Sequence, residues 1–114
     1  ALLTGDLEGQ GETDLLSWMD ETDMNNLHAD ILKIAHHGSK NATTGQFLET
    51  VRADLAVISA GINNIYGHPS SETLRRLDAA GIPYLCTINC GQISVHWKAG
   101  RIVSEGKTRA VCGK

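Results

Sequence analysis

Apolar and polar positions fall into blocks along the chain, and their periods predict alternating strands and helices. Nearly continuous apolar runs, typical of strands covered on both faces, predict strands at residues 1–4, 29–35 and 55–60. Apolar residues at helical spacing predict helices over residues 12–21, after Thr43 or Thr44, and from Ser70 or Ser71 to Gly81. Residues 82–88 and 92–97 are expected to form a hairpin around Asn89-Cys90-Gly91, with a last strand at 101–103.

This βαβαβαββ order predicts an α/β fold with right-handed crossovers between parallel strands. In such a sheet, polar residues that directly follow the strands meet at one edge, where ligands usually bind. Three segments meet this description: Gly5-Asp6, the run His36-His37-Gly38-Ser39, and the loop from Gly61 to His68. We therefore expect the chemically capable side chains to gather at this edge.

An aspartate and histidines at a sheet edge are suitable ligands for zinc, manganese or iron. Asp6 is either such a ligand or the cap of the turn that follows it. His36 and His37 point to opposite sides if the backbone is extended, so both can bind one metal only if the chain turns there, and Gly38 permits such a turn. We expect one metal ligand and one second-shell or substrate-contacting residue. His68 either precedes the next helix or donates a proton to a leaving group.

Composition limits the class of protein and the kinds of site that the sequence can contain. The 114 residues, with 41% hydrophobic and 20% charged residues and a net charge of −3, predict one small soluble globular domain. No apolar run approaches the roughly 18 residues of a membrane-spanning helix. Three cysteines without a CxxC pair predict ordinary thiols rather than a disulfide framework or a zinc site. Aromatic residues make up 4% and are not interleaved with basic ones, so no base-stacking platform is expected.

Charge divides the chain unevenly. Residues 1–30 hold eight carboxylates and no lysine or arginine, whereas residues 98–114 hold five cations against Glu105. We therefore treat residues 1–103 as the folded subdomain and residues 104–114 as a basic tail, which is more typical of a solvated end than of a phosphate-binding surface.

The runs LLTGD, ADILKIAHHGSK and LAVISAGINNIYGHP, followed by a leucine-containing helix and an alternating strand, resemble a known family. They are similar to the C-terminal half of the metallo-β-lactamase-fold hydrolase domain of ComEC-type DNA-uptake competence proteins. The order TGD, HHGS, YGHP is specific, whereas each triplet alone is weak. The resemblance implies half of an αββα sandwich, and a bacterial, membrane-anchored parent protein.

The same resemblance implies a site with two divalent metal ions, zinc or manganese. Asp6 would bridge the metals and be catalytic, and a histidine of HHGS would be a ligand; we prefer His37 over His36. His68 would line the pocket and contact the leaving group or a phosphate oxygen. Substrate contacts would come from His36, Ser39, Asn63 and Asn64.

The chain departs from this family in one important respect: it has no HxHxDH ligand motif. We therefore expect it to bind metal poorly and to be inactive alone, with the missing N-terminal half of the same domain as its partner. The parent would be a hydrolase of phosphodiesters, with DNA or another phosphoester as substrate. The alternative is a non-catalytic scaffold or interaction domain that keeps the fold. An unpartnered first strand also favours homo-oligomers.

Overall fold

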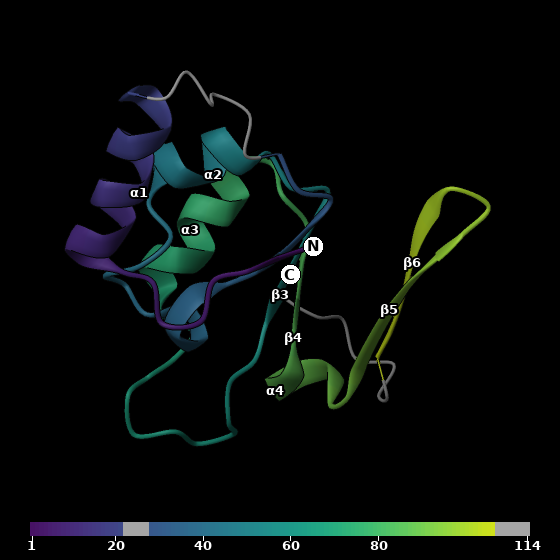
Figure 1. Cartoon of the computed structure of the whole chain (residues 1–114). Helices are drawn as coiled ribbons and strands as arrows, with labels where there is room; N and C mark the ends of the chain where they lie inside the picture. The colour runs from purple at the N-terminus through teal and green to yellow at the C-terminus, as the bar shows by residue number, and fades with distance from the viewer. Residues whose placement is uncertain (22–27, 107–114) are drawn as a thin grey trace.

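The computed structural model describes residues 1–21 and 28–106 and is a mixed α/β structure (Figure 1). Its elements are β1 (Leu2–Leu3), α1 (Gly9–Glu21), β2 (Ile31–Lys33), the 3₁₀ helix η1 (Ala35–Gly38), α2 (Gly45–Val51), β3 (Leu55–Ile58), α3 (Ser71–Ala79), β4 (Tyr84–Cys86), α4 (Thr87–Cys90), β5 (Ile93–Lys98) and β6 (Arg101–Gly106).

Strands β1, β2, β3 and β4 form one parallel sheet in the order of the sequence, as the α/β prediction requires. Helices α1, α2 and α3 lie together on one side of this sheet, and the β5–β6 hairpin lies on the other side (Figure 1). Because all four strands run in the same direction, their carboxyl ends share one edge. The segments that follow β1, β2 and β3 therefore converge, as predicted.

The core lies between the sheet and the helices. Leu32 and Ala56 are paired in register across β2 and β3 and are fully buried, together with Phe47 of α2 and Leu77 of α3. Side chains alternate along a strand, so the next row of the sheet faces the other way. That row, on the open face, consists of Leu3, Lys33, Val57 and Leu85.

Helix starts follow the predicted capping chemistry. The Thr44 side chain accepts from the Phe47 N–H, and the Ser70 side chain accepts from the Thr73 N–H, so Thr44 and Ser70 are the N-caps of α2 and α3. Helix α1 begins at Gly9, three residues before the predicted start.

The predicted hairpin is wrong. Residues 84–86 form β4 and pair with β3 in the parallel sheet, and the segment Thr87–Cys90 is a short helix rather than a turn. Strand β5 pairs instead with β6 in an antiparallel hairpin. Its turn contains Ala99 and Gly100, both with positive φ, which suits a tight hairpin connection. Strand β6 also runs through the boundary placed at residue 103.

The prediction of ordinary thiols is wrong for one cysteine. Cys90 is disulfide-bonded, whereas Cys86 is a free and buried thiol. Cys112 and the cations after residue 106 lie outside the described residues. Within residues 1–21 and 28–106, no helix has both the length and the apolar character needed to cross a membrane.

Candidate functional site at the carboxyl edge of the sheet

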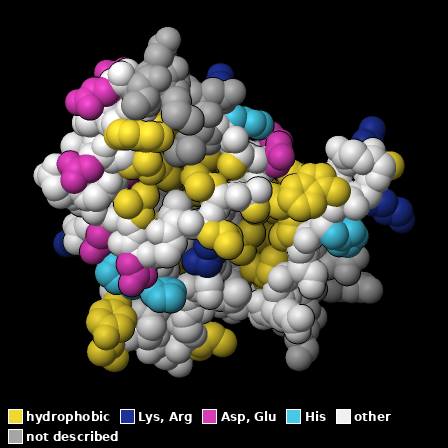
Figure 2. Space-filling model, in the orientation of Figure 1, with side chains coloured by type: hydrophobic (Ala, Val, Ile, Leu, Met, Phe, Trp, Pro, Cys, Tyr) yellow, Lys and Arg dark blue, Asp and Glu magenta, His cyan; other side chains and the backbone are white. Residues whose placement is uncertain are grey.

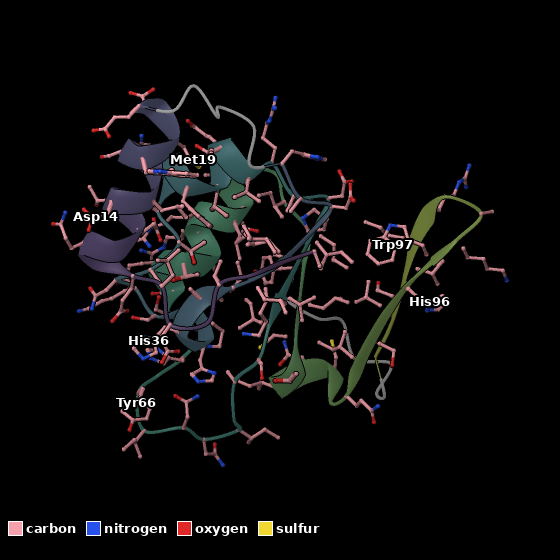
Figure 3. The ribbon with its side chains drawn as sticks, viewed as in Figure 1. Asp14, Met19, His36, Tyr66, His96 and Trp97 are labelled. Carbon is pink, nitrogen blue, oxygen red and sulfur yellow. The ribbon has the colours of Figure 1, made fainter. Side chains whose placement is uncertain are left out.

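Backbone hydrogen bonds bring the strand-end segments together. The His36 N–H donates to the Gly5 carbonyl at 2.8 Å, which joins the segment after β1 to η1. The Ser70 N–H donates to the Gly38 carbonyl at 2.9 Å, which joins η1 to the loop that follows β3. His36 and Tyr66 accordingly lie at the same corner of the molecule (Figure 3). The edge therefore forms one connected site from three distant parts of the sequence.

The two adjacent histidines adopt left-handed backbone conformations, with φ of 47° at His36 and 56° at His37. This conformation costs a residue with a side chain about 1–2 kcal/mol, and such strain is often found at functional sites. The chain thus turns at the histidines themselves, whereas the sequence suggested a turn permitted by Gly38. As a result, the two rings bind different partners.

His36 pairs with Glu8. The His36 Nδ1 atom lies 2.8 Å from a Glu8 carboxylate oxygen, and the two side chains are 38% and 32% exposed. The hydrogen bond to Glu8 is the largest cause of the raised pKa of His36; burial opposes it, and the negative charges of Glu8 and Asp6 add smaller increases. The same hydrogen bond lowers the pKa of Glu8. His36 is therefore the cationic member of the site over a wider pH range than an ordinary histidine.

His37 is held by the backbone. Its Nδ1 atom lies 2.7 Å from the Ser59 carbonyl oxygen, which follows β3. A carbonyl can only accept, so Nδ1 donates the hydrogen bond, and the neutral ring then carries its lone pair on Nε2. Metal-binding histidines commonly have this arrangement, in which a second-shell carbonyl fixes the tautomer. The contact suits a metal ligand and gives His37 the better geometry of the two histidines.

His68 lies in the same group of rings. Its ring centroid is 5.9 Å from that of His36 and 5.7 Å from that of Tyr66, on which it stacks at an interplanar angle of 19°. The His68 Nδ1 atom is buried and has no hydrogen-bond partner among the described residues. None of the described protein groups therefore fixes the tautomer at Nδ1, so the ring can present either a proton or a lone pair at Nε2.

Asp6 is exposed just beyond β1. Its charge acts on two neighbours: it contributes to the raised pKa of His36, and it opposes the lowering of the Lys33 pKa that burial causes. Asp6 and His36 thus share one electrostatic environment at the rim.

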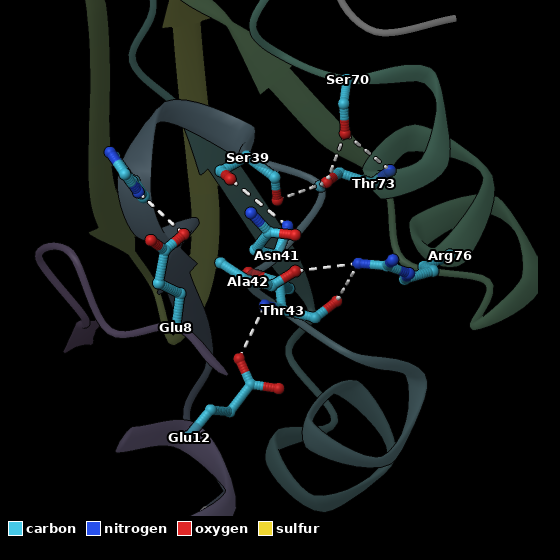
Figure 4. Close-up of polar contacts among 10 residues, drawn as sticks. Glu8, Glu12, Ser39, Asn41, Ala42, Thr43, Ser70, Thr73 and Arg76 are labelled. Atoms are coloured by element: carbon cyan, nitrogen blue, oxygen red, sulfur yellow. Dashed lines mark hydrogen bonds and ion pairs between the residues drawn. The ribbon is translucent and has the colours of Figure 1, made fainter. Parts of the chain in front are cut away.

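The three other predicted contact residues differ in position. Ser39 is 5% exposed, and its hydroxyl accepts from the Asn41 N–H at 3.3 Å (Figure 4). Asn64 uses its whole amide inside the loop: it donates to the Gly61 and His68 carbonyls and accepts from the His68 N–H. Asn63 is exposed with a φ of 56°. The structure thus shows Ser39 and Asn64 in supporting contacts and leaves only Asn63 open to solvent.

Two residues of the site were missed in the sequence. Glu8 stands two positions after Asp6, and Tyr66 stands two positions before His68. That spacing places side chains on one side of an extended segment and was the available signal. It was weak, because single glutamates and tyrosines in loops are common.

The donor set at this edge fits part of a metal site. Asp6 offers a carboxylate and His37 an imidazole whose tautomer suits coordination, but a catalytic zinc normally has about three protein ligands. Within the described residues, one group of three such side chains has ligand atoms within 4.8 Å of one another. That group is His28, Asp30 and Asp54, at the opposite edge of the sheet. A metal ion at the carboxyl edge would therefore require ligands from outside the described residues.

The fold and the site define an α/β domain with a histidine-rich rim at the carboxyl ends of a parallel sheet. The chain is 39% identical over 97 residues to ComE operon protein 3 of Bacillus subtilis, a match that covers 85% of this chain and 12% of that protein. It is 38% identical over 104 residues to competence protein ComA of Neisseria gonorrhoeae, a match that covers 91% of this chain and 14% of that protein. It is 30% identical over 109 residues to recombination protein 2 of Haemophilus influenzae, a match that covers 95% of this chain and 13% of that protein.

These homologues point to a family of competence and DNA-uptake proteins. The chain spans about an eighth of the length of these relatives. No family profile and no solved structure matches it.

Proposed function

We propose that this chain is the C-terminal part of a metal-dependent phosphodiesterase of the metallo-β-lactamase fold that acts in DNA uptake. The observation that carries the proposal is the His37 contact, in which the Nδ1 atom is bound to the Ser59 carbonyl and Nε2 is left as the ligand atom. The names of the homologues support the link to DNA uptake, and the resemblance of the TGD, HHGS and YGHP segments supports the hydrolase.

Asp6 and His37 would hold a zinc or manganese ion together with ligands from the N-terminal half of the domain. A divalent cation at such a site supplies Lewis-acid catalysis of the attack of water on a phosphodiester. His36, whose pKa the hydrogen bond to Glu8 raises, would in its protonated form attract a phosphate oxygen of the substrate. His68 would donate a proton to the leaving oxygen as a general acid, because its ring can carry a proton at Nε2.

The open face of the sheet is an apolar surface on which the proposed partner, the N-terminal half of the domain, can pack. Leu3 on this face is 78% exposed, and Trp97 of the hairpin is 52% exposed. Figure 2 shows hydrophobic side chains gathered between the hairpin and the body of the domain. A groove of about 430 Å³ lies there, between β4 and β6. We propose that the N-terminal half of the same domain packs on this apolar surface, which burial would stabilise.

The test uses the natural full-length protein. We expect hydrolysis of bis(p-nitrophenyl) phosphate and of DNA in the presence of Mn²⁺ or Zn²⁺, and none after removal of metal with EDTA. Asp6→Asn and His37→Gln should each lower turnover at least about 100-fold while the circular dichroism spectrum is retained. Asp14→Asn, an exposed change on α1, is the matched control.

Full activity of either site variant would overturn the proposal. Purified protein without metal and without activity would instead favour the non-catalytic scaffold.

A further inference from the structure

Three aromatic rings form a continuous row at the rim of the site. Tyr66 stacks on His68 with ring centroids 5.7 Å apart, and His68 lies 5.9 Å from His36. Such spacings are typical of interacting aromatic rings. The row begins at the exposed tip of the loop after β3 and ends at the histidine that Glu8 holds. It therefore joins an exposed aromatic surface to the polar His36–Glu8 pair.

The loop that carries Tyr66 is unusually apolar for its exposure. Ile62, Ile65 and Tyr66 are 71%, 90% and 74% exposed, and residues 61–67 contain no charged side chain. Hydrophobic side chains project from the molecule at this corner beside histidine and acidic side chains (Figure 2). Exposed apolar groups gathered in this way mark a contact surface.

The loop is braced from within. The Asn64 amide donates to the His68 carbonyl at 2.6 Å and accepts from the His68 N–H at 2.9 Å. This bracing fixes the backbone on both sides of Tyr66, so its ring stays on His68 while most of its surface faces solvent. A ring held in this way is prepared to stack on a flat partner, because little conformational freedom is lost on binding.

We propose that Tyr66 is a base-stacking residue of a subsite for single-stranded nucleic acid, with the phosphate of the same strand directed toward His36. The inference rests on the proposed phosphodiesterase function and adds a requirement for an unpaired base. A nucleobase offers the flat aromatic face that fits Tyr66, and the backbone attached to that base would run along the row of rings toward His36. A purely apolar partner, such as a protein surface or a membrane, would use the isoleucines as well and would make no use of His36.

The experiment measures binding to the natural full-length protein by fluorescence anisotropy, with EDTA present to stop cleavage. One probe is a labelled ten-nucleotide oligothymidylate, and the other is an abasic deoxyribose-phosphate strand of the same length. Wild-type protein should bind the oligothymidylate more tightly than the abasic strand. Tyr66→Ala should weaken binding of the oligothymidylate about tenfold and leave binding of the abasic strand unchanged.

Two variants separate stacking from general contact. Tyr66→Phe keeps the ring and should bind the oligothymidylate within about twofold of wild type. Ile65→Ala, which removes the neighbouring exposed side chain, should also leave this affinity unchanged. Circular dichroism checks that each variant is folded.

The proposal is overturned if Tyr66→Ala weakens both probes equally, if Ile65→Ala reproduces the loss, or if wild-type protein binds the two probes alike or binds neither. Metal-dependent hydrolysis of bis(p-nitrophenyl) phosphate, which contains no nucleobase, decides the proposed function separately. If the protein hydrolyses this ester but binds the two probes alike, the proposed function stands and only the base-stacking subsite is rejected.

Discussion

The carboxylate of Glu8 accepts a hydrogen bond from His36 Nδ1 at 2.8 Å, although 28 residues separate the two in the sequence. The contact ties the segment after β1 to the left-handed turn after β2. It occupies Nδ1 of His36 with a carboxylate, whereas the neighbouring His37 uses Nδ1 to bind a carbonyl. Two adjacent histidines thus have different hydrogen-bond partners, a carboxylate for His36 and a backbone carbonyl for His37.

We predict that His36 titrates above the ordinary histidine value and that Glu8→Gln lowers its pKa. The hydrogen bond and charge of Glu8 are the main causes of the raised pKa, and glutamine removes the charge. The titration of the His36 ring protons by NMR measures the effect. Glu49→Gln, an exposed change on α2, is the control and should leave His36 unaffected. An unchanged midpoint in Glu8→Gln would contradict the pairing.

The same pair predicts how stability depends on pH. A raised histidine pKa stabilises the folded state fully below the unfolded pKa, and this contribution is lost as pH rises through the folded pKa. The lowered Glu8 pKa contributes above its unfolded value and loses this contribution as pH falls. The pair therefore contributes most between the ordinary values of 4.5 and 6.5. Urea midpoints of wild type and Glu8→Gln should differ most in this interval and converge outside it.

Gly38→Ala should destabilise the fold by about 3 kcal/mol. Gly38 has a φ of 86°, and an added Cβ would lie 2.6 Å from Pro69 Cβ and 2.9 Å from Pro69 Cα. The substitution therefore combines an unfavourable backbone conformation with a clash against a rigid neighbour. Gly61→Ala is the matched control, because nothing lies within 4 Å of its added Cβ. Urea unfolding compares the two, and equal midpoints would show that the close approach is absent.

The parallel part of the fold was predictable because its signals are local. Strands β1, β2 and β3 and the capping residues Thr44 and Ser70 appear in the sequence as apolar runs and as hydroxyl side chains at the right spacing, although β1 is not covered on both faces, since Leu3 is 78% exposed. The pairing of β4 was not predictable because Cys90 and Gly91 resemble a hairpin turn, while its partners in β3 lie 28 residues earlier in the sequence. Pairing with a distant strand has no local signature.

The site was predictable in part, because the strands that its residues follow have local sequence signals. The positions of His36, His37 and His68 after strands follow from the order of the elements. The partners of the rings do not, since Glu8 comes from the segment after β1 and Ser59 and Tyr66 come from the segment after β3. Sequence patterns give the edge on which a side chain lies, and tertiary contacts decide what it does there.

Glu12→Ala should destabilise the protein by about 3 kcal/mol. Glu12 is 2% exposed, and its carboxylate accepts hydrogen bonds from the Thr43 N–H, the Thr44 N–H and the Thr44 hydroxyl, all between 2.6 and 2.8 Å. Its contact with Thr43 is drawn in Figure 4. Alanine would leave buried donors without a partner at the start of α2. Glu49→Ala, on the surface of α2, is the control and should change the free energy of unfolding by less than about 0.5 kcal/mol.

Arg76→Lys should loosen the segment between η1 and α2. The guanidinium of Arg76 donates to the carbonyls of Lys40 and Ala42, both at 2.9 Å, and so connects this segment to α3. Figure 4 shows the contact with Ala42. A lysine ammonium cannot reach both acceptors with the same planar fork, so we expect a loss of about 1–2 kcal/mol.

Amide hydrogen exchange provides a local readout of this change. In Arg76→Lys, exchange should accelerate at residues 40–44 more than in the β2–β3 core, because the lost contacts hold only that segment. The control is Arg75→Lys, an exposed change one position earlier on the same helix, which should leave the pattern unchanged. Uniform acceleration throughout the domain would instead indicate that Arg76 supports global stability. It would contradict a specific dependence of residues 40–44 on the hydrogen bonds from Arg76. Because His36 and His37 directly precede the segment, its loosening should also broaden their NMR signals.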